Sequence, residues 1–152
     1  MAGWRIGMVA GHQEYIKNVL KVKSNMDSGM FLPMQAAAAE ALNNPESWYN
    51  TVNEVYARRR KIVEEIMDIL KCKYNKTQVG LFVWGAIPDE IKSCEEYVEN
   101  ILQKTHVFIT PGFIFGSNGE RYIRISLCAT ESKLQEAKLR LRNIMNEGNG
   151  IQ

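Results

Sequence analysis

The sequence predicts an α/β fold in which a long helix is followed by a small sheet with helices around it. Three features support this prediction. A helical apolar pattern extends from Glu46 to Lys71, two segments with strand character lie at Val79–Ile87 and around Arg124, and amphipathic helical patterns separate and follow these strands. At 152 residues, the chain is long enough for one ordinary domain with its own core.

The composition argues against several classes of function. A formal net charge of +2, with charges of both signs interspersed, gives no sign of a nucleic-acid or membrane partner. No apolar run is long enough to span a bilayer, and the first residues lack the order of a signal peptide. The cysteines Cys72, Cys94 and Cys128 form no paired or zinc-binding pattern, so we expect reduced thiols and a cytoplasmic location. The two histidines, His12 and His106, are far apart, and we expect no metal site.

The first 45 residues predict one strand and two helices. The segment Arg5–Ala10 is apolar and bounded by glycines, which is typical of a buried strand, although nothing before it offers a neighbouring strand. An amphipathic helix is expected over His12–Ser24, followed by a loop over Asn25–Pro33. The alanine-rich segment Gln35–Leu42 predicts a second helix.

The segment Glu46–Lys71 predicts the longest element. Its apolar residues recur at steps of three and four, which gives a helix of roughly seven turns with one apolar stripe. Such a helix could be one strand of a coiled coil or a connection between two lobes. The run Arg58-Arg59-Arg60 suggests a nucleic-acid contact, but three consecutive residues spread around a helix. We therefore expect solvated charge there.

The second half of the chain alternates between strands and helices. The segment Lys71–Lys76 is polar and turn-like, and Thr130 is an acceptable N-cap for the last helix. The other expected elements are a strand at Val79–Ile87, a helix at Ile91–Thr105, a short strand at Val107–Ile109 and a helix at Glu131–Glu147.

The strand around Arg124 carries the candidate site. Tyr122, Arg124 and Ser126 alternate with apolar residues, so this strand is expected to be half-buried, and Arg121 at its start is read as a solvated edge residue. Arginine is seldom buried without a partner. Arg124 could also be a solvated edge residue, or it could present a planar fork of donors to a carboxylate or phosphate over the glycine-rich loop 110–119.

Two phrases at opposite ends of the chain carry a resemblance to a known family. Ala-Gly-Trp-Arg-Ile-Gly at residues 2–7 and Arg-Tyr-Ile-Arg-Ile-Ser-Leu at 121–127 together resemble fold-type I pyridoxal-phosphate aminotransferases, of the class I/II group that includes the aspartate and diaminopimelate aminotransferases. Phrases between them agree in order, so the resemblance extends from Met1 to about Glu147. It implies a remnant of the large cofactor-binding domain at 1–45 and the small C-terminal domain, with its long interdomain helix, at 46–152.

The resemblance also implies roles for individual residues. Arg5 matches the arginine that binds the cofactor phosphate, and Arg124 matches the arginine that binds the substrate's α-carboxylate. The segment from Phe113 to Phe115 matches the loop that closes near the substrate. The family's Schiff-base lysine would fall upstream of Met1, so no catalytic residue is assigned and we expect the isolated chain to be inactive.

The implied parent activity is transfer of an amino group between an amino acid and a 2-oxo acid, with pyridoxal 5'-phosphate as cofactor. An unpaired strand at 5–10 and bare helix faces also predict a homodimer or larger assembly. Two alternatives stay open. The chain could be a non-catalytic α/β module that binds a partner through its N-terminal strand and alanine-rich helix, or the complementing half of a split enzyme.

Overall fold

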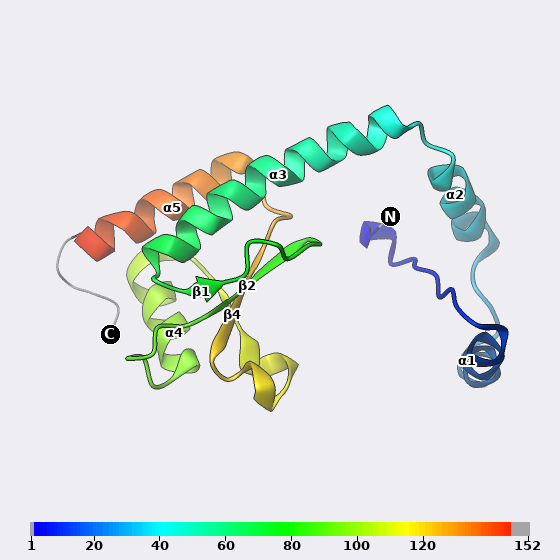
Figure 1. Cartoon of the computed structure of the whole chain (residues 1–152), viewed down its shortest axis with the longest axis horizontal. Helices are drawn as coiled ribbons and strands as arrows, with labels where there is room; N and C mark the ends of the chain where they lie inside the picture. Colours follow the sequence, from blue (N-terminus) through cyan, green and yellow to red (C-terminus); the bar gives the residue numbers. More distant parts are fainter. Residues whose placement is uncertain (1, 147–152) are drawn as a thin grey trace. The chain divides into compact units, whose positions relative to one another are not determined.

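The structure, a computed structural model, describes residues 2–146. The chain divides into two compact units, Met1–Asn50 and Thr51–Gln152, and each is described by itself. The first unit contains the 3-10 helix η1 (Ala2–Trp4), the helices α1 (Gln13–Met26) and α2 (Leu32–Leu42), and the first turn of α3 (Glu46–Ile69) (Figure 1). Within residues 2–146, no helix is both long and apolar enough to cross a membrane.

The strand predicted at Arg5–Ala10 is not formed. Arg5 lies in a turn with φ of 55°, and the residues that follow it have no regular structure. A strand needs a neighbour for its backbone N–H and C=O groups, and residues 2–50 contain no other strand that could supply one. None of residues 3–50 is buried, so this unit has no core of its own.

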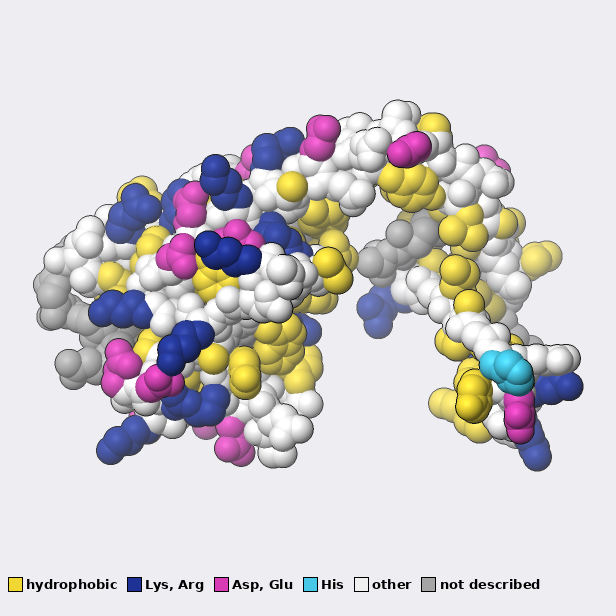
Figure 2. Space-filling model, viewed as in Figure 1, with side chains coloured by type: hydrophobic (Ala, Val, Ile, Leu, Met, Phe, Trp, Pro, Cys, Tyr) yellow, Lys and Arg dark blue, Asp and Glu magenta, His cyan; other side chains and the backbone are white. Residues whose placement is uncertain are grey.

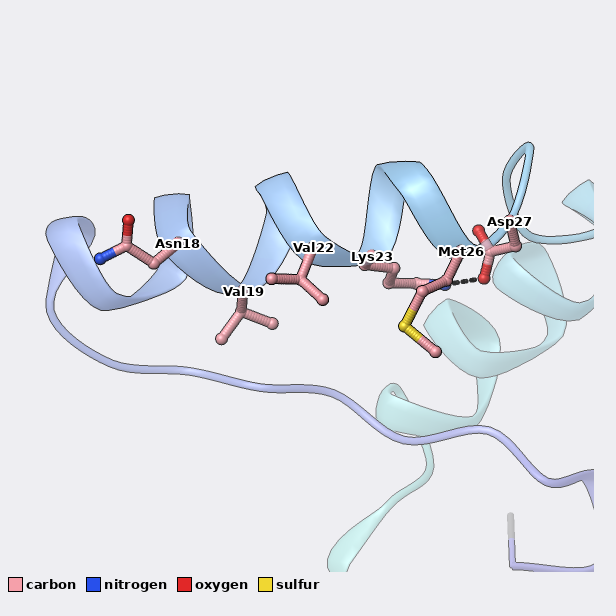
Figure 3. Close-up of a pocket in the computed structure, with 6 residues that line it drawn as sticks. All are labelled: Asn18, Val19, Val22, Lys23, Met26 and Asp27. Atoms are coloured by element: carbon pink, nitrogen blue, oxygen red, sulfur yellow. Dashed lines mark hydrogen bonds and ion pairs between the residues drawn. The ribbon is translucent and has the colours of Figure 1, made fainter.

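Both helices predicted in the first unit are confirmed, and most of their large apolar side chains are exposed (Figure 2). The second helix begins earlier than predicted because Pro33, in its first turn, needs no N–H partner there. Figure 3 shows Val19, Val22 and Met26 on one side of α1, beside the ion pair of Lys23 with Asp27. These residues line a shallow apolar groove along the helix.

The second unit is built on a four-stranded antiparallel sheet. Its strands are β1 (Lys73–Tyr74), β2 (Phe82–Ala86), β3 (Thr110–Pro111) and β4 (Tyr122–Ser126), in the order β1-β2-β4-β3. The strand predicted at Val107–Ile109 is wrong in position, because the pairing with β4 begins at Thr110. The polar segment 71–76, predicted to be a turn, contains the two residues of β1.

The register of β2 and β4 sorts their side chains onto two faces. Directly opposite partners share a face, and the pairs are Val83 with Ile125 and Gly85 with Ile123 on one face. Trp84 pairs with Arg124 on the other face, which also carries the partners Phe82↔Ser126 and Ala86↔Tyr122. This confirms the alternation predicted for the strand around Arg124.

Three helices cover the first of these faces: α3, α4 (Cys94–Thr105) and α5 (Glu131–Asn146) (Figure 1). The ideal Cβ position of Gly85 lies 2.9 Å from the Sδ atom of Met67, so a larger residue here would displace the Met67 side chain of α3. The Tyr97 hydroxyl donates to the Leu70 carbonyl oxygen at 3.0 Å and joins α4 to the end of α3. The fully buried aliphatic side chains of this core are Val63, Ile66, Leu70, Val83, Ile87, Ile101, Ile123, Leu127 and Leu141.

The long helix predicted from Glu46 is confirmed, and two ion pairs attach it to α5. Arg58 pairs with Glu131 at 3.1 Å, and Glu65 pairs with Lys138 at 2.7 Å. The two contacts are seven residues apart on both helices, so α3 and α5 run parallel. Lys138 also holds the pKa of the Glu65 carboxyl below its usual range through a side-chain hydrogen bond.

The arginines predicted to be solvated instead bond to loop carbonyls. Arg59 donates to the Leu127 oxygen at 3.1 Å, and Arg60 donates to the Gly80 oxygen at 2.7 Å. Arg121 donates to the Pro88 oxygen at 2.8 Å and also to the Ile91 oxygen. These three side chains are half-buried. The reason is that carbonyls just beyond strand ends lack ladder partners, and the long arginine side chain can reach them.

The cysteines give a test of this core. Burial raises the pKa of the Cys72 thiol to about 12 and also raises the pKa of the Cys94 thiol, whereas Cys128 is exposed. Because the thiolate is the reactive species, we expect iodoacetamide at pH 8 to alkylate Cys128 alone in the native chain. Mass spectrometry should find all three thiols labelled in denaturant. Native labelling of Cys72 as fast as that of Cys128 would contradict the packing.

Candidate functional site

Arg124 lies at the centre of β4, opposite Trp84 of β2 on one side and Thr110 of β3 on the other. Its guanidinium carbon is 4.2 Å from the centroid of the Phe82 ring and 4.1 Å from that of the Phe115 ring. Both distances are well within the range for cation–π attraction. The two aromatic rings therefore hold a charged group on the face of the sheet that the helices leave uncovered.

The donors of Arg124 are not used by an acid within residues 2–146. Among residues 2–146, no carboxylate forms an ion pair with this guanidinium, and its side chain is half-buried. A cation–π contact uses the face of a guanidinium and leaves the N–H groups at its edge. Arg124 can thus offer a planar pair of donors to an incoming carboxylate or phosphate.

The rings around Arg124 form a connected group. The Trp84 ring meets the Phe115 ring edge-on, with centroids 5.4 Å apart, and meets the Tyr122 ring in the same way at 6.3 Å. These distances are typical of favourable aromatic pairs. We call Phe82, Trp84, Phe115 and Tyr122 the aromatic face. All four are partly accessible to solvent, so the face is a surface that a ligand can reach.

The loop between β3 and β4 carries Phe113 and Phe115. It consists of two 3-10 turns, η2 (Gly112–Phe115) and η3 (Ser117–Gly119). A Cβ at Gly112 would lie 2.4 Å from the Gly119 oxygen, so the two backbones meet at the base of the loop where no side chain fits. The structure brings Phe115 to Arg124, and it places Phe113 on the same turn with its side chain exposed.

Arg5 belongs to the first unit and is exposed there. Its positive φ sets it in a turn after η1, and within residues 2–146 no carboxylate forms an ion pair with it. A guanidinium with free donors fits a phosphate group, which it can bind by two parallel hydrogen bonds. Arg5 therefore has donors that an anionic group such as a phosphate could reach.

Comparison with known proteins decides the family. The profile described as "Aminotransferase class I and II" matches residues 1–141. The chain belongs to this family. Its relatives include the LL-diaminopimelate aminotransferases of Halothermothrix orenii and Aquifex aeolicus, which are 35% and 36% identical over 94% and 95% of the chain. These alignments cover 36% and 37% of the two relatives, so the chain spans little more than a third of their length.

Solved structures agree with this assignment. The aromatic aminotransferase from Pyrococcus horikoshii superposes with a TM-score of 0.80 and 30% identity, over 98% of this chain and 40% of that one. An aminotransferase from Staphylococcus aureus superposes with a TM-score of 0.77 and 29% identity, over 96% and 39%. Class I and II aminotransferases use pyridoxal 5'-phosphate, and the free donors of Arg5 are compatible with that cofactor's phosphate.

Part of the site in this aminotransferase chain was not predicted from its sequence. Arg124 and Phe115 were predicted, but Phe82 and Trp84 were not placed on the same face as Arg124. The sequence contains the information needed to place them, because Phe82 and Trp84 are two residues apart in a predicted strand and so must share a face. The side-chain amide of Gln78, which contacts Trp84, was also missed, and no sequence pattern indicates it.

Proposed function

We propose that the chain is the carboxylate-binding part of a pyridoxal-phosphate aminotransferase, which transfers an amino group between an amino acid and a 2-oxo acid. The observation that supports this best is the Arg124 guanidinium, which is held by two rings and has no acid partner among residues 2–146. The carboxylate shared by both substrates matches the spacing of its donors. The names of the relatives, LL-diaminopimelate aminotransferases, support amino acids as the substrate class.

In this proposal, the chain's own residues bind and orient. Arg124 fixes the α-carboxylate, and the rings of Phe113 and Phe115 exclude water on the loop side of the substrate. Arg5 binds the phosphate of the cofactor. Pyridoxal 5'-phosphate, when bound, supplies the electron sink that weakens the Cα–H bond of the substrate. The contribution of the arginines is geometric, because a substrate held in one orientation reacts faster than a free one.

We further propose that the chain alone is inactive, because no lysine of its own matches the family's Schiff-base lysine. A second candidate function is supported by the exposed apolar side chains of residues 3–50. These side chains suit a segment that docks onto another polypeptide, either as an interaction module or as one half of a split enzyme. The location proposed for the protein is the cytoplasm, which agrees with its three free cysteines.

The carboxylate assignment predicts the effect of Arg124→Lys in a full-length aminotransferase that contains this chain. Lysine keeps the charge but loses the paired donors, so one charge-assisted contact of roughly 1.5–3 kcal/mol weakens. We expect kcat/KM for the amino donor to fall by about one to two orders of magnitude. Arg142→Lys, the same change at an exposed position of α5, is the matched control. An unchanged kcat/KM in Arg124→Lys would show that Arg124 has only a structural role.

The proposed inactivity of the chain alone predicts how it reacts with the cofactor. After incubation with pyridoxal 5'-phosphate and borohydride reduction, we expect low labelling spread over several exposed lysines. Peptide mass spectrometry measures the distribution of label. Stoichiometric labelling of a single lysine would instead mean that the chain has its own covalent cofactor site.

The exposed apolar residues of the first unit predict self-association. Phe31 and Leu32 are 68% and 72% exposed, and an apolar surface of this kind is normally covered in solution. We propose a homodimer or larger assembly that buries these residues. Light scattering should give at least twice the monomer mass for the intact chain, and the monomer mass for a version that begins at Asn44. An intact chain that stays monomeric at high concentration would refute this proposal.

A further inference from the structure

The outer edge of β2 is only partly covered by a strand. The two residues of β1 pair with Ala86 and Gly85, and the chain then turns away from the sheet. The next position along β2 is Trp84, whose backbone N–H and C=O point away from β4. The Leu127 N–H donates to the Leu81 oxygen, and the Ile87 N–H donates to the Arg121 oxygen, so the backbone groups of residues 81 and 87 point toward β4. Because backbone groups alternate along a strand, those of Trp84 point the other way.

A side chain takes the place of the missing strand at Trp84. The Trp84 N–H donates to Oε1 of Gln78 at 2.8 Å, and Nε2 of Gln78 donates to the Trp84 carbonyl oxygen at 3.1 Å. One primary amide thus makes the pair of bonds that an extended residue of a neighbouring strand would make. The orientation of the amide is fixed, because only its oxygen can accept from the backbone N–H.

The amide of Gln78 is itself held in place. Its Nε2 atom also donates to the Asn75 carbonyl oxygen at 2.9 Å, so both donors of the amide are used. The Oδ1 atom of Asn75 accepts from the Thr77 backbone N–H and hydroxyl, each at 2.8 Å. The segment 75–78 is therefore a closed turn that presents one half-buried amide to the sheet.

Trp84 connects this turn to Arg124 by two routes. Trp84 and Arg124 are directly opposite each other across β2 and β4. Because the Trp84 backbone bonds outward, they form a non-hydrogen-bonded pair, the type in which side chains lie closer together. The Trp84 ring also meets the Phe115 ring, which in turn lies over the Arg124 guanidinium. The position of Trp84 therefore affects both the strand and the ring that orient Arg124.

We propose that Gln78 is a positioning residue for the carboxylate-binding arginine. Its side-chain amide fixes Trp84, and through Trp84 and Phe115 it holds the Arg124 guanidinium in the orientation that binds a carboxylate. The orienting effect stands on the geometry of this chain, whereas its effect on carboxylate binding rests on the proposed function.

The test uses the intact chain labelled with ¹⁵N and reads the Arg124 Nε–H signal by NMR, assigned by its loss in Arg124→Lys. The two nearby rings displace this signal, so its position reports how the guanidinium sits against them. Gln78→Leu removes both bonds to Trp84. We expect the signal to move toward the position of a free arginine, and the affinity of Arg124 for sodium acetate to fall about 2- to 12-fold, the range for the net loss of one hydrogen bond.

Gln78→Glu is the second variant, and it keeps the test informative if Gln78→Leu fails to fold. At pH 7 its carboxylate can accept from the Trp84 N–H but cannot donate to the Trp84 oxygen. We expect the Arg124 signal to be displaced as in Gln78→Leu, and to return toward the wild-type position as the pH falls below about 4.3 and the carboxyl gains a proton. Gln103→Leu is the matched control, because the Gln103 amide donates to the Glu99 carboxylate on the exposed surface of α4.

Three outcomes separate the two proposals. An Arg124 signal at the wild-type position in both Gln78 variants at pH 7 overturns the positioning role and leaves Gln78 as a cap on the sheet edge. A displaced signal with unchanged acetate affinity also overturns it. If acetate does not shift the Arg124 signal even in the wild-type chain, but Gln78→Leu and Gln78→Glu displace it, the orienting effect is supported and the proposed carboxylate function fails.

Discussion

The pairing of β2 with β4 is the interaction on which the second unit depends. Its register places Val83, Gly85 and Ile123 against the helices, and places Phe82, Trp84 and Arg124 on the opposite face. A shift of one residue would exchange the two faces, burying the arginine and exposing the isoleucines. The apolar core and the candidate site thus depend on the same backbone hydrogen bonds between β2 and β4. A change in the register of this pairing would disrupt both.

The contacts outside the sheet reinforce this pairing from its ends. Arg59 and Arg60 of α3 bond to carbonyls at Leu127 and Gly80, where β4 has ended and β2 has not yet begun, and Arg121 does the same at the other end of the sheet. The arginines at these positions stabilise the fold by bonding to carbonyls, whereas the Arg124 guanidinium makes no such bond among residues 2–146. Arg59, Arg60 and Arg121 therefore differ from Arg124 in that their donors reach backbone carbonyls of the same unit.

The sequence predicted most of the second unit, because apolar periodicity marks its helices and its two long strands. It could not place β1 and β3. Each of these strands has only two residues, and they are strands only because they pair with a neighbouring strand. In the first unit the helices were predictable, but the apolar segment 5–10 was not a strand, since burial and pairing depend on neighbours that a local pattern does not contain. At the site, Arg124 and Phe115 followed from family resemblance, while Gln78 acts through a contact that only the folded chain reveals.

The contact between Gly112 and Gly119 divides the second unit into a fixed part and a variable part. Because the backbones of Gly112 and Gly119 touch, the loop between them is closed at its base, next to the ends of β3 and β4. Exchanges at the exposed residues Ser117 or Asn118 can alter the surface of the loop while the strands keep their register. What the loop presents beside Arg124 can thus diverge in small steps, with the strand that carries the arginine unchanged.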